Sequence, residues 1–358
     1  MSELTDLTER LVSIPSHEDE TQAGDAIESW LRDETEANVT RDDAGNVRAW
    51  RNESADAPSL AFVGHHDVVP PDDSQTADGG EYVVYRDDGR LHGRGTADMK
   101  GAVAAMLLAF READPDRPLG FASFVGEEVG GEGARFAIEG GFDPDYALVG
   151  EGSTGYSADG VLDVAVAHKG RRASTVTAAG TSAHASEPEA GENAVYRACD
   201  AVDVIRDLDA PSADVLGETL SGSVAVTEID GGTAWNVIPD ECAVTVDERT
   251  VPGERADLAS VEDIAGVSWA VDQDLPPMAC DDEAFADAAV AAVRAEQDGA
   301  GERVSKPHAT DAGWLADAGV TCLVCGPAEP GEAHTATESV SVDVLGRCRR
   351  VYERVAER

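Results

Sequence analysis

Histidine and carboxylate side chains follow several predicted strands at the point where each strand ends. Strand 60–63 runs into Gly64-His65-His66-Asp67, and in extended chain His65 and Asp67 project to the same side. A carboxylate behind a histidine fixes the orientation and the tautomer of the ring, which is the usual arrangement at a metal site. Taken alone, the pair is more often a strand-end histidine beside a solvated aspartate.

Two more predicted strands end in glutamates. Strand 121–125 leads into Gly126-Glu127-Glu128, and strand 146–149 leads into Gly150-Glu151. Adjacent carboxylates at a strand end point to different sides, so one of Glu127 and Glu128 can coordinate a cation while the other takes a proton from water. A Glu-Glu pair alone is usually part of a solvated loop.

Asp98 and His334 complete the set. Asp98 lies in the glycine-rich turn 93–101, which lacks the G-K-[ST] ending of a phosphate loop, and such an aspartate alone is more often a helix cap. His334 lies in the Gly/Pro-containing loop 326–335. Nitrogen and oxygen ligands without thiolate suit Zn²⁺, Co²⁺ or Mn²⁺, and five of them suit two ions that share one bridging carboxylate. The five candidate ligands are His65, Asp98, Glu128, Glu151 and His334.

The residues around these motifs predict the elements that position them. Strands and helices alternate through the first half of the chain, which favours an α/β sheet with helices on both faces. Open sheets of this kind place ligands at strand ends. The predicted helices are 4–12, 25–31, 101–112 and 134–139, and the predicted strands are 45–50, 59–63, 119–125 and 146–149.

The pattern changes near residue 170 and returns near residue 280. Between these points we predict strands and two helices, which form a compact α+β unit inserted into the α/β domain. We therefore predict two domains. One consists of residues 1–171 and 279–358, and the inserted one consists of residues 172–278. In the insert we expect strands 174–178, 223–229 and 242–247 with helices 193–208 and 256–264, and after it helices 284–295, 312–318 and 344–355 with strand 320–324.

Charge excludes several classes of partner. The chain of 358 residues has 27 Lys+Arg against 71 Asp+Glu, a formal net charge of −44. So negative a surface repels nucleic acid and anionic membranes. No stretch approaches the ~20 apolar residues of a membrane span, and the N-terminus lacks the features of a secretory signal. We therefore expect a cytoplasmic protein.

The same imbalance leads to a hypothesis about the host. At low salt a globular chain of this charge suffers strong self-repulsion, whereas at about 1 M salt the Debye length falls to ~3 Å. We expect a cytoplasm with high salt. The six cysteines are too sparse for a disulfide scaffold, and Cys322-x-x-Cys325 lies in an apolar run that predicts a buried strand rather than a redox or metal site.

Taken in order, these motifs resemble the M20 family of co-catalytic zinc aminoacylases and peptidases. The resemblance rests on 64–70, 93–101, Glu127-Glu128, Gly150-Glu151 and 333–335, and within the insert on 180–185, 236–240 and 247–249. It implies a three-layer mixed-sheet catalytic domain of residues 1–171 and 279–358, with residues 172–278 as a lid and dimerisation domain.

The resemblance also implies individual roles. Asp98 would bridge two metal ions, zinc above all with cobalt or manganese as alternatives. His65 and Glu151 would complete one site, and Glu128 and His334 the other. Asp67 would support His65, and Glu127 would be the general base. The peptide bond Asp98–Met99 is expected to be cis.

The lid is expected to contribute to the reaction in a homodimer. The resemblance implies that His184 reaches a partner subunit's active site and donates a hydrogen bond to the developing oxyanion, although a histidine in such a loop is otherwise a plain surface residue. Arg249 is a candidate clamp for a substrate carboxylate, with an ion pair to Asp247 as the alternative. The weaker candidates for substrate contact are Asn236, Thr310, Arg171 and Arg172.

Together these features predict a metal-dependent amidohydrolase that removes an N-acyl group, succinyl or acetyl, from an amino acid. The motifs 64–71 and 93–101 favour N-succinyl-diaminopimelate as substrate. Acetylornithine deacetylase and a small carboxypeptidase are the alternatives within the family. A metal-stabilised homodimer that binds a ligand without hydrolysing it is the alternative outside it, and Glu127 argues against it because a binding protein needs no general base.

Overall fold

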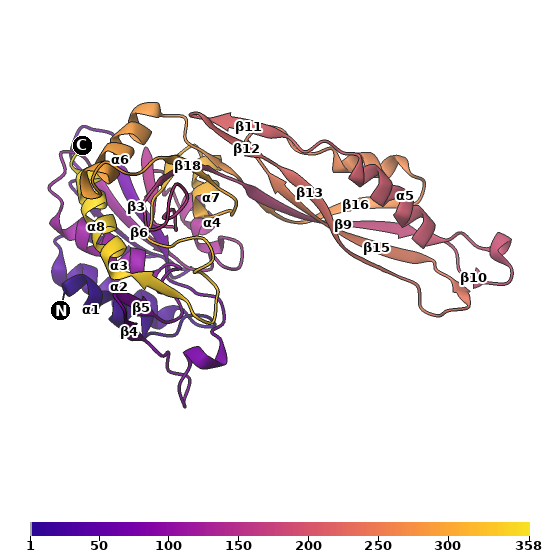
Figure 1. Cartoon of the computed structure of the whole chain (residues 1–358), viewed down its shortest axis with the longest axis horizontal. Coiled ribbons are helices and arrows are strands. Elements are labelled where there is room, and N and C mark those ends of the chain that lie inside the picture. Colours follow the sequence, from indigo (N-terminus) through magenta and orange to yellow (C-terminus); the bar gives the residue numbers. More distant parts are fainter. Residues whose placement is uncertain (1) are drawn as a thin grey trace.

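The structure is a computed structural model that describes residues 2–358. A large α/β unit contains both ends of the described chain, and a long arm projects from one side of it (Figure 1). The arm extends from β9, which begins at Gly170, to β16, which ends at Leu275, and it overlaps most of the predicted insert 172–278. The mixed α/β architecture with an inserted α+β unit confirms the predicted fold class.

A nine-stranded mixed sheet forms the centre of the α/β unit. Its order is β1-β2-β6-β3-β7-β19-β8-β17, with β18 paired to β8. The strands β6, β3, β7 and β19 run parallel to one another, so their carboxyl ends meet at one edge. The strands are β1 (Asn38–Arg41), β2 (Val47–Arg51), β3 (Leu60–His65), β6 (Leu119–Phe124), β7 (Tyr146–Val149), β8 (Val164–His168), β17 (Met278–Ala279), β18 (Arg303–Lys306) and β19 (Thr321–Val324).

Helices cover both faces of this sheet and make the three layers. One hydrophobic core joins the sheet to α1, α2, α3, α6 and α8, and a second joins it to α4 and α7. Helix α3 is buried along almost its whole length because it is apolar on all sides and α1 and α8 pack against it. The helices are α1 (Glu3–Val12), α2 (Thr21–Glu34), α3 (Lys100–Glu112), α4 (Glu132–Glu139), α6 (Glu283–Glu296), α7 (Asp311–Asp317) and α8 (Val342–Ala356).

The arm is an antiparallel sheet of order β13-β15-β9-β16. In β9 and β15 every second residue is buried, because one face of the sheet packs against helix α5 while the other is open. These elements are β9 (Gly170–Ala179), α5 (Ala194–Arg206), β13 (Ser223–Gly231), β15 (Glu241–Thr250) and β16 (Val267–Leu275), with the short strands β10 (Ala183–His184) and β14 (Val237–Ile238) near the tip.

The helix predicted over 256–264 is wrong in type. The chain forms a 3-10 helix, Leu258–Asp263, with Leu258 and Val261 buried. Side chains at positions i and i+3 eclipse in a 3-10 helix, so this short turn brings both apolar residues to the core of the arm.

Several strands were not predicted. Strand β16 was missed because it lies at the edge of the arm sheet and most of its residues are at least partly exposed, so it carries little apolar signal. The small sheets are β4 (Tyr85–Asp87) and β5 (Arg90–His92) with β20 (Ser339–Ser341), and the hairpin β11 (Ser212–Val215) with β12 (Glu218–Ser221). Among residues 2–358, no helix is long and apolar enough to cross a membrane.

Candidate metal centre and substrate pocket

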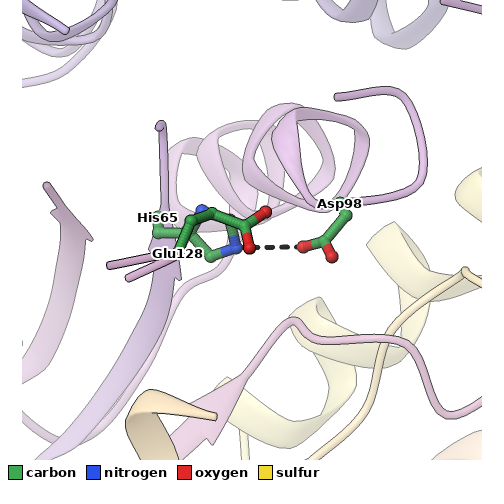
Figure 2. A group of neighbouring side chains, drawn as sticks. All are labelled: His65, Asp98 and Glu128. Carbon is green, nitrogen blue, oxygen red and sulfur yellow. Dashed lines mark hydrogen bonds and ion pairs between the residues drawn. The ribbon is translucent and has the colours of Figure 1, made fainter. Parts of the chain in front are cut away.

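The candidate ligands come from three adjacent strand ends and two loops. His65 is the last residue of β3, Glu128 follows β6, and Glu151 follows β7. Asp98 comes from the turn before α3, where the Asp98–Met99 bond is cis as expected, and His334 comes from the loop after β19. Figure 2 shows the side chains of His65, Asp98 and Glu128 turned toward one another.

The two oxygens of Asp98 face two different histidines. Asp98 Oδ1 lies 3.0 Å from His65 Nε2, and Asp98 Oδ2 lies 3.1 Å from His334 Nε2. A second carboxylate lies beside each histidine: Glu151 Oε1 is 3.3 Å from His65 Nε2, and Glu128 Oε1 is 3.0 Å from His334 Nε2. The structure thus brings all five predicted ligands together, in two groups that share Asp98.

Asp67 fixes the tautomer of His65. His65 Nδ1 donates to the backbone carbonyl of Asp67 at 3.1 Å and lies 3.2 Å from its Oδ1. A carbonyl oxygen only accepts, so the proton is on Nδ1. The other nitrogen, Nε2, faces carboxylate oxygens, and it is either protonated or bound to a cation. Asp67 Oδ2 also accepts from the backbone N–H of Glu128 at 3.0 Å, which connects two of the strand ends.

Negative charge is in excess at this edge of the sheet. Burial raises the pKa of Glu127 well above its usual value, and it also raises the pKa of Glu128. Burial alone would lower the pKa of His65, but the carboxylates of Asp67, Asp98 and Glu151 outweigh it and raise that pKa well above 6.5. More carboxylates are gathered here than cationic side chains can neutralise, which is the chemistry of a site for divalent cations.

The ligand groups open into a pocket of about 390 Å³ between the α/β unit and the base of the arm. One wall is acidic and carries Glu127 with the ligand carboxylates. An oxygen of Glu127 lies within 4.8 Å of ligand atoms of His65 and Glu151. The lining also includes three side chains that contain cationic or imidazole nitrogen, namely Arg171, Lys306 and His308.

The sequence profile of peptidase family M20/M25/M40 matches residues 61–358, which is more than half of the chain. The chain belongs to this family. It is 30% identical over 329 residues to the succinyl-diaminopimelate desuccinylase of Stenotrophomonas maltophilia, with 86% of each chain covered. It is 32% identical over 315 residues to the acetylornithine deacetylase of Myxococcus xanthus, which covers 83% of this chain and 79% of that protein.

Solved structures share the fold along the whole chain. The aminopeptidase PepT of Bacillus cereus superposes with a TM-score of 0.78 at 21% identity, covering 99% of this chain and 98% of its own. A Bacillus subtilis protein described as a dinuclear metal binding peptidase from the M20 family gives a TM-score of 0.72 at 16% identity, with coverage of 99% and 96%. As a member of peptidase family M20/M25/M40, the chain is a hydrolase, and metal dependence is a property of its family.

Two arginines at the base of the arm share one aspartate. Arg171 Nε donates to Asp247 Oδ2 at 2.7 Å, and Arg249 Nε donates to Asp247 Oδ1 at 2.8 Å. The ion pair that we considered as an alternative for Arg249 is therefore present. Arg171 nevertheless lines the pocket, whereas Arg249 is outside the set of lining residues found within 2–358.

Arg172 and Thr310 make structural contacts. Arg172 is buried and donates to Glu248 Oε2 at 2.6 Å, on the side of the arm sheet that packs against its core. The hydroxyl of Thr310 lies 3.2 Å from His168 Nε2 and accepts from the N–H of Ala312 at 3.2 Å. Because His168 Nδ1 donates to a carbonyl, its Nε2 must accept, so the hydroxyl proton of Thr310 is already engaged.

Asn236 and His184 lie away from the pocket. Both are near the tip of the arm, where strand β10 pairs with β14 (Figure 1). His184 is exposed, its Nδ1 lies 2.7 Å from the hydroxyl of Ser186, and the backbone carbonyl of Asn236 accepts from the N–H of Ala185. Within the described chain these two residues are separated from the other predicted site residues.

Two residues of the pocket region were not predicted. Asp311 is buried, burial raises its pKa to about 8, and within residues 2–358 neither of its carboxylate oxygens has a hydrogen-bond partner. Lys306 is 5% exposed, and its Nζ lies 3.6 Å from Glu151 Oε2. Lysine occurs only three times in this acidic chain, so its scarcity was a signal that could have drawn attention to Lys306.

Proposed function

We propose that the chain is an amidohydrolase that removes an N-acyl group from an amino acid with the help of two divalent cations, zinc or alternatively cobalt or manganese. His65 and Glu151 would hold one cation, Glu128 and His334 the other, and Asp98 both. The observation that carries this proposal is the position of the Asp98 carboxylate, whose two oxygens face different histidines at 3.0 and 3.1 Å.

The donor set fits such cations. Two imidazole nitrogens and three carboxylates, without a cysteine, are the ligands that Zn²⁺, Co²⁺ and Mn²⁺ accept in hydrolases. The tautomer of His65 leaves Nε2 as the nitrogen that would bind. The raised pKa values of the half-buried Glu127 and Glu128 also support a site that lacks positive charge until cations bind.

Glu127 has the position of the general base. Two bound cations would polarise the amide carbonyl, lower the pKa of a water molecule and stabilise the charge that develops on the carbonyl oxygen. Glu127 lines the same pocket, takes a proton from the attacking water and then delivers it to the leaving amine. Asp67 keeps the ring of His65 in the orientation that binding requires.

His184 supports the proposal of a homodimer. It is exposed on the arm and away from the pocket of its own chain, so it can assist catalysis by reaching the pocket of a second copy. There its imidazole donates a hydrogen bond to the developing oxyanion, a contribution of the same kind as an oxyanion-hole donor.

The cationic side chains in the pocket lining favour a substrate with a carboxylate. Arg171 pairs with Asp247 and Lys306 lies beside Glu151, but each keeps further N–H groups that a substrate carboxylate in the pocket could accept from. Every N-acyl amino acid has the α-carboxylate of the amino acid, but a succinyl group adds a second carboxylate on the acyl side, which an acetyl group lacks. We therefore propose N-succinyl-diaminopimelate or a closely similar N-succinyl amino acid as substrate. The acetylornithine deacetylase among the relatives makes deacetylation the second candidate.

A turnover screen tests the proposal. The full chain is incubated in concentrated KCl with Zn²⁺ or Co²⁺ and with N-succinyl amino acids, N-acetyl amino acids and dipeptides, and release of free amine is measured. We expect N-succinyl substrates to be hydrolysed fastest and a chelator to abolish turnover. If N-acetyl substrates are hydrolysed fastest, the enzyme is a deacetylase and the proposed substrate is wrong. Turnover that survives complete metal removal would contradict the cation mechanism.

A further inference from the structure

A buried carboxylate outside the pocket connects the two loops that carry Asp98 and His334. The side chain of Glu338 has no exposed surface. Its Oε1 accepts hydrogen bonds from three backbone N–H groups, those of Gly95 at 2.8 Å, Ala97 at 3.0 Å and Asp98 at 3.2 Å. Its Oε2 accepts from the guanidinium of Arg94. Each of these contacts to Glu338 comes from a donor group, so one side chain holds the backbone of the Asp98 turn and the guanidinium of Arg94 together.

Through these contacts Glu338 joins the segment that carries His334 to the turn that carries Asp98. Glu338 lies on the segment that runs from His334 into β20, and its own carbonyl accepts from the N–H of Gly93 at 3.0 Å. One residue therefore attaches the His334 segment to the start, middle and end of the turn that presents Asp98. The side chains at the two ends of this connection, Asp98 and His334, lie 3.1 Å apart.

The other ligands are fixed in a different way. His65 is the last residue of a buried strand, its ring is held by Asp67, and Glu151 follows the neighbouring parallel strand. His334, in contrast, lies in a loop with a positive φ of 63°, and half of its side chain is exposed. The sheet can position His65 and Glu151 without Glu338, whereas His334 depends on its loop.

We infer that Glu338 is a positioning residue that sets Asp98 against His334, and that it controls the affinity of the cation bound by Asp98, Glu128 and His334 more than that of the cation bound with His65 and Glu151. This inference depends on the proposed two-cation function. Partners that orient metal ligands change metal affinity by about 10–100-fold when they are removed. In Glu338→Gln the amide NH₂ must face either Arg94 or the backbone N–H groups, so one set of hydrogen bonds is lost.

The arm contains a matched control. Glu248 is also buried, accepts from a guanidinium (Arg172, 2.6 Å) and accepts from a backbone N–H (Ala256, 2.9 Å), but it lies outside the pocket lining found in residues 2–358. Glu248→Gln therefore reproduces the loss of a buried ion pair without touching the ligand loops. A merely structural role of Glu338 would predict the same result for both variants.

The experiment is a stepwise titration of the metal-free full-length chain with Co²⁺, followed by visible absorption, and with Zn²⁺, followed by calorimetry. We expect two bound equivalents in the wild type, a loss of about 10-fold or more in the affinity of one equivalent in Glu338→Gln, and two unchanged equivalents in Glu248→Gln. If Glu338→Gln does not fold, Glu338→Asp, which keeps the charge but shortens the side chain, is titrated instead.

Two results would overturn the inference while leaving the function intact: equal affinities in wild type and Glu338 variants, or an equal loss at both equivalents. The same loss in Glu248→Gln would also overturn it, by showing that general destabilisation is the cause. A wild type that binds a single equivalent or none would instead contradict the proposed two-cation function.

Discussion

Glu127 and Glu128 are consecutive residues whose carboxylates face different partners. Glu128 Oε1 lies 3.0 Å from His334 Nε2, whereas Glu127 groups with His65 and Glu151 on the other side of Asp98. Both residues lie in the hydrogen-bonded turn that follows β6, rather than in extended chain, and this turn sends the two side chains toward different partners. One strand end thereby supplies a candidate ligand and a candidate base to the same pocket.

Replacing the candidate base should remove catalysis and leave the cations. For Glu127→Gln we expect kcat for amine release to fall by about 10²–10⁴-fold, because the proton of the attacking water loses its acceptor. Metal content, measured by mass spectrometry, should stay equal to that of the wild type. Glu139→Gln, an exposed change at the end of α4, serves as control. An unchanged rate would exclude Glu127 from the mechanism.

Complementation can test whether His184 acts in a second copy. His184→Asn and Glu127→Gln should each be nearly inactive, but mixed dimers contain one pocket in which both groups are intact. With random exchange of subunits we expect about a quarter of wild-type activity to return. If His184→Asn alone keeps wild-type activity, or if mixing restores none, then His184 has no role in a partner's pocket.

Lys306 in the pocket lining predicts how substrates are discriminated. In Lys306→Met the length of the side chain is kept and the charge is lost. We expect kcat/KM for an N-succinyl amino acid to fall by about 10–100-fold, the usual value of a charged hydrogen bond, with a much smaller effect on the N-acetyl analogue. Equal losses for both substrates would show that Lys306 acts on Glu151, 3.6 Å away, rather than on the acyl group.

The candidate ligands could be predicted from the sequence because each has a local signature. His65, Glu128 and Glu151 come directly after apolar runs that form parallel strands, and parallel strands bring their carboxyl ends to one edge. Asp98 and His334 lie in glycine-containing segments of a recognisable family pattern. The order of these motifs along the chain was therefore enough to predict which five side chains gather at the candidate metal centre.

Contacts that depend on side-chain packing had no such signature. Asp311 and Lys306 reach the pocket region only because β18 pairs with β8 and α7 follows it, and neither the register of β18 nor the start of α7 can be predicted from local periodicity. Thr310, a predicted substrate contact, lines the pocket, but its hydroxyl proton is engaged by His168, which lies far away in the sequence. Which hydrogen bonds a polar residue makes is decided by the tertiary structure.

Buried neutral histidine should make stability depend on pH. Burial lowers the pKa of His168 to about 3, whereas its ordinary value is 6.5. The unfolded chain therefore binds a proton that the folded chain does not, so the contribution of His168 is full above pH 6.5 and is lost as the pH falls toward 3. In metal-free protein, His168→Gln should reduce the slope of unfolding free energy against pH, between about pH 5 and 6, by up to about 1.4 kcal/mol per pH unit. An unaltered slope would show that His168 is protonated in the folded state.

The net charge of −44 predicts a strong dependence of stability on salt. We expect the melting temperature to rise by about 5 °C or more between about 0.1 M and about 3 M KCl, because screening removes self-repulsion of the folded chain. Sucrose, which is excluded from the surface but does not screen charge, is the control. The same melting temperature at both salt concentrations would contradict the hypothesis of a host with high internal salt.

The way in which the arm joins the α/β unit has a mechanical consequence. Arg171, Gln273 and Leu275 line the pocket, and they lie within a few residues of the two points where the chain enters and leaves the arm. Strand β9 continues for about 26 Å beyond Arg171, toward the tip that carries His184. If the arm rotates about these two connections, a residue moves in proportion to its distance from them. A small rotation therefore leaves Arg171 almost in place but displaces the imidazole of His184 by many times as much.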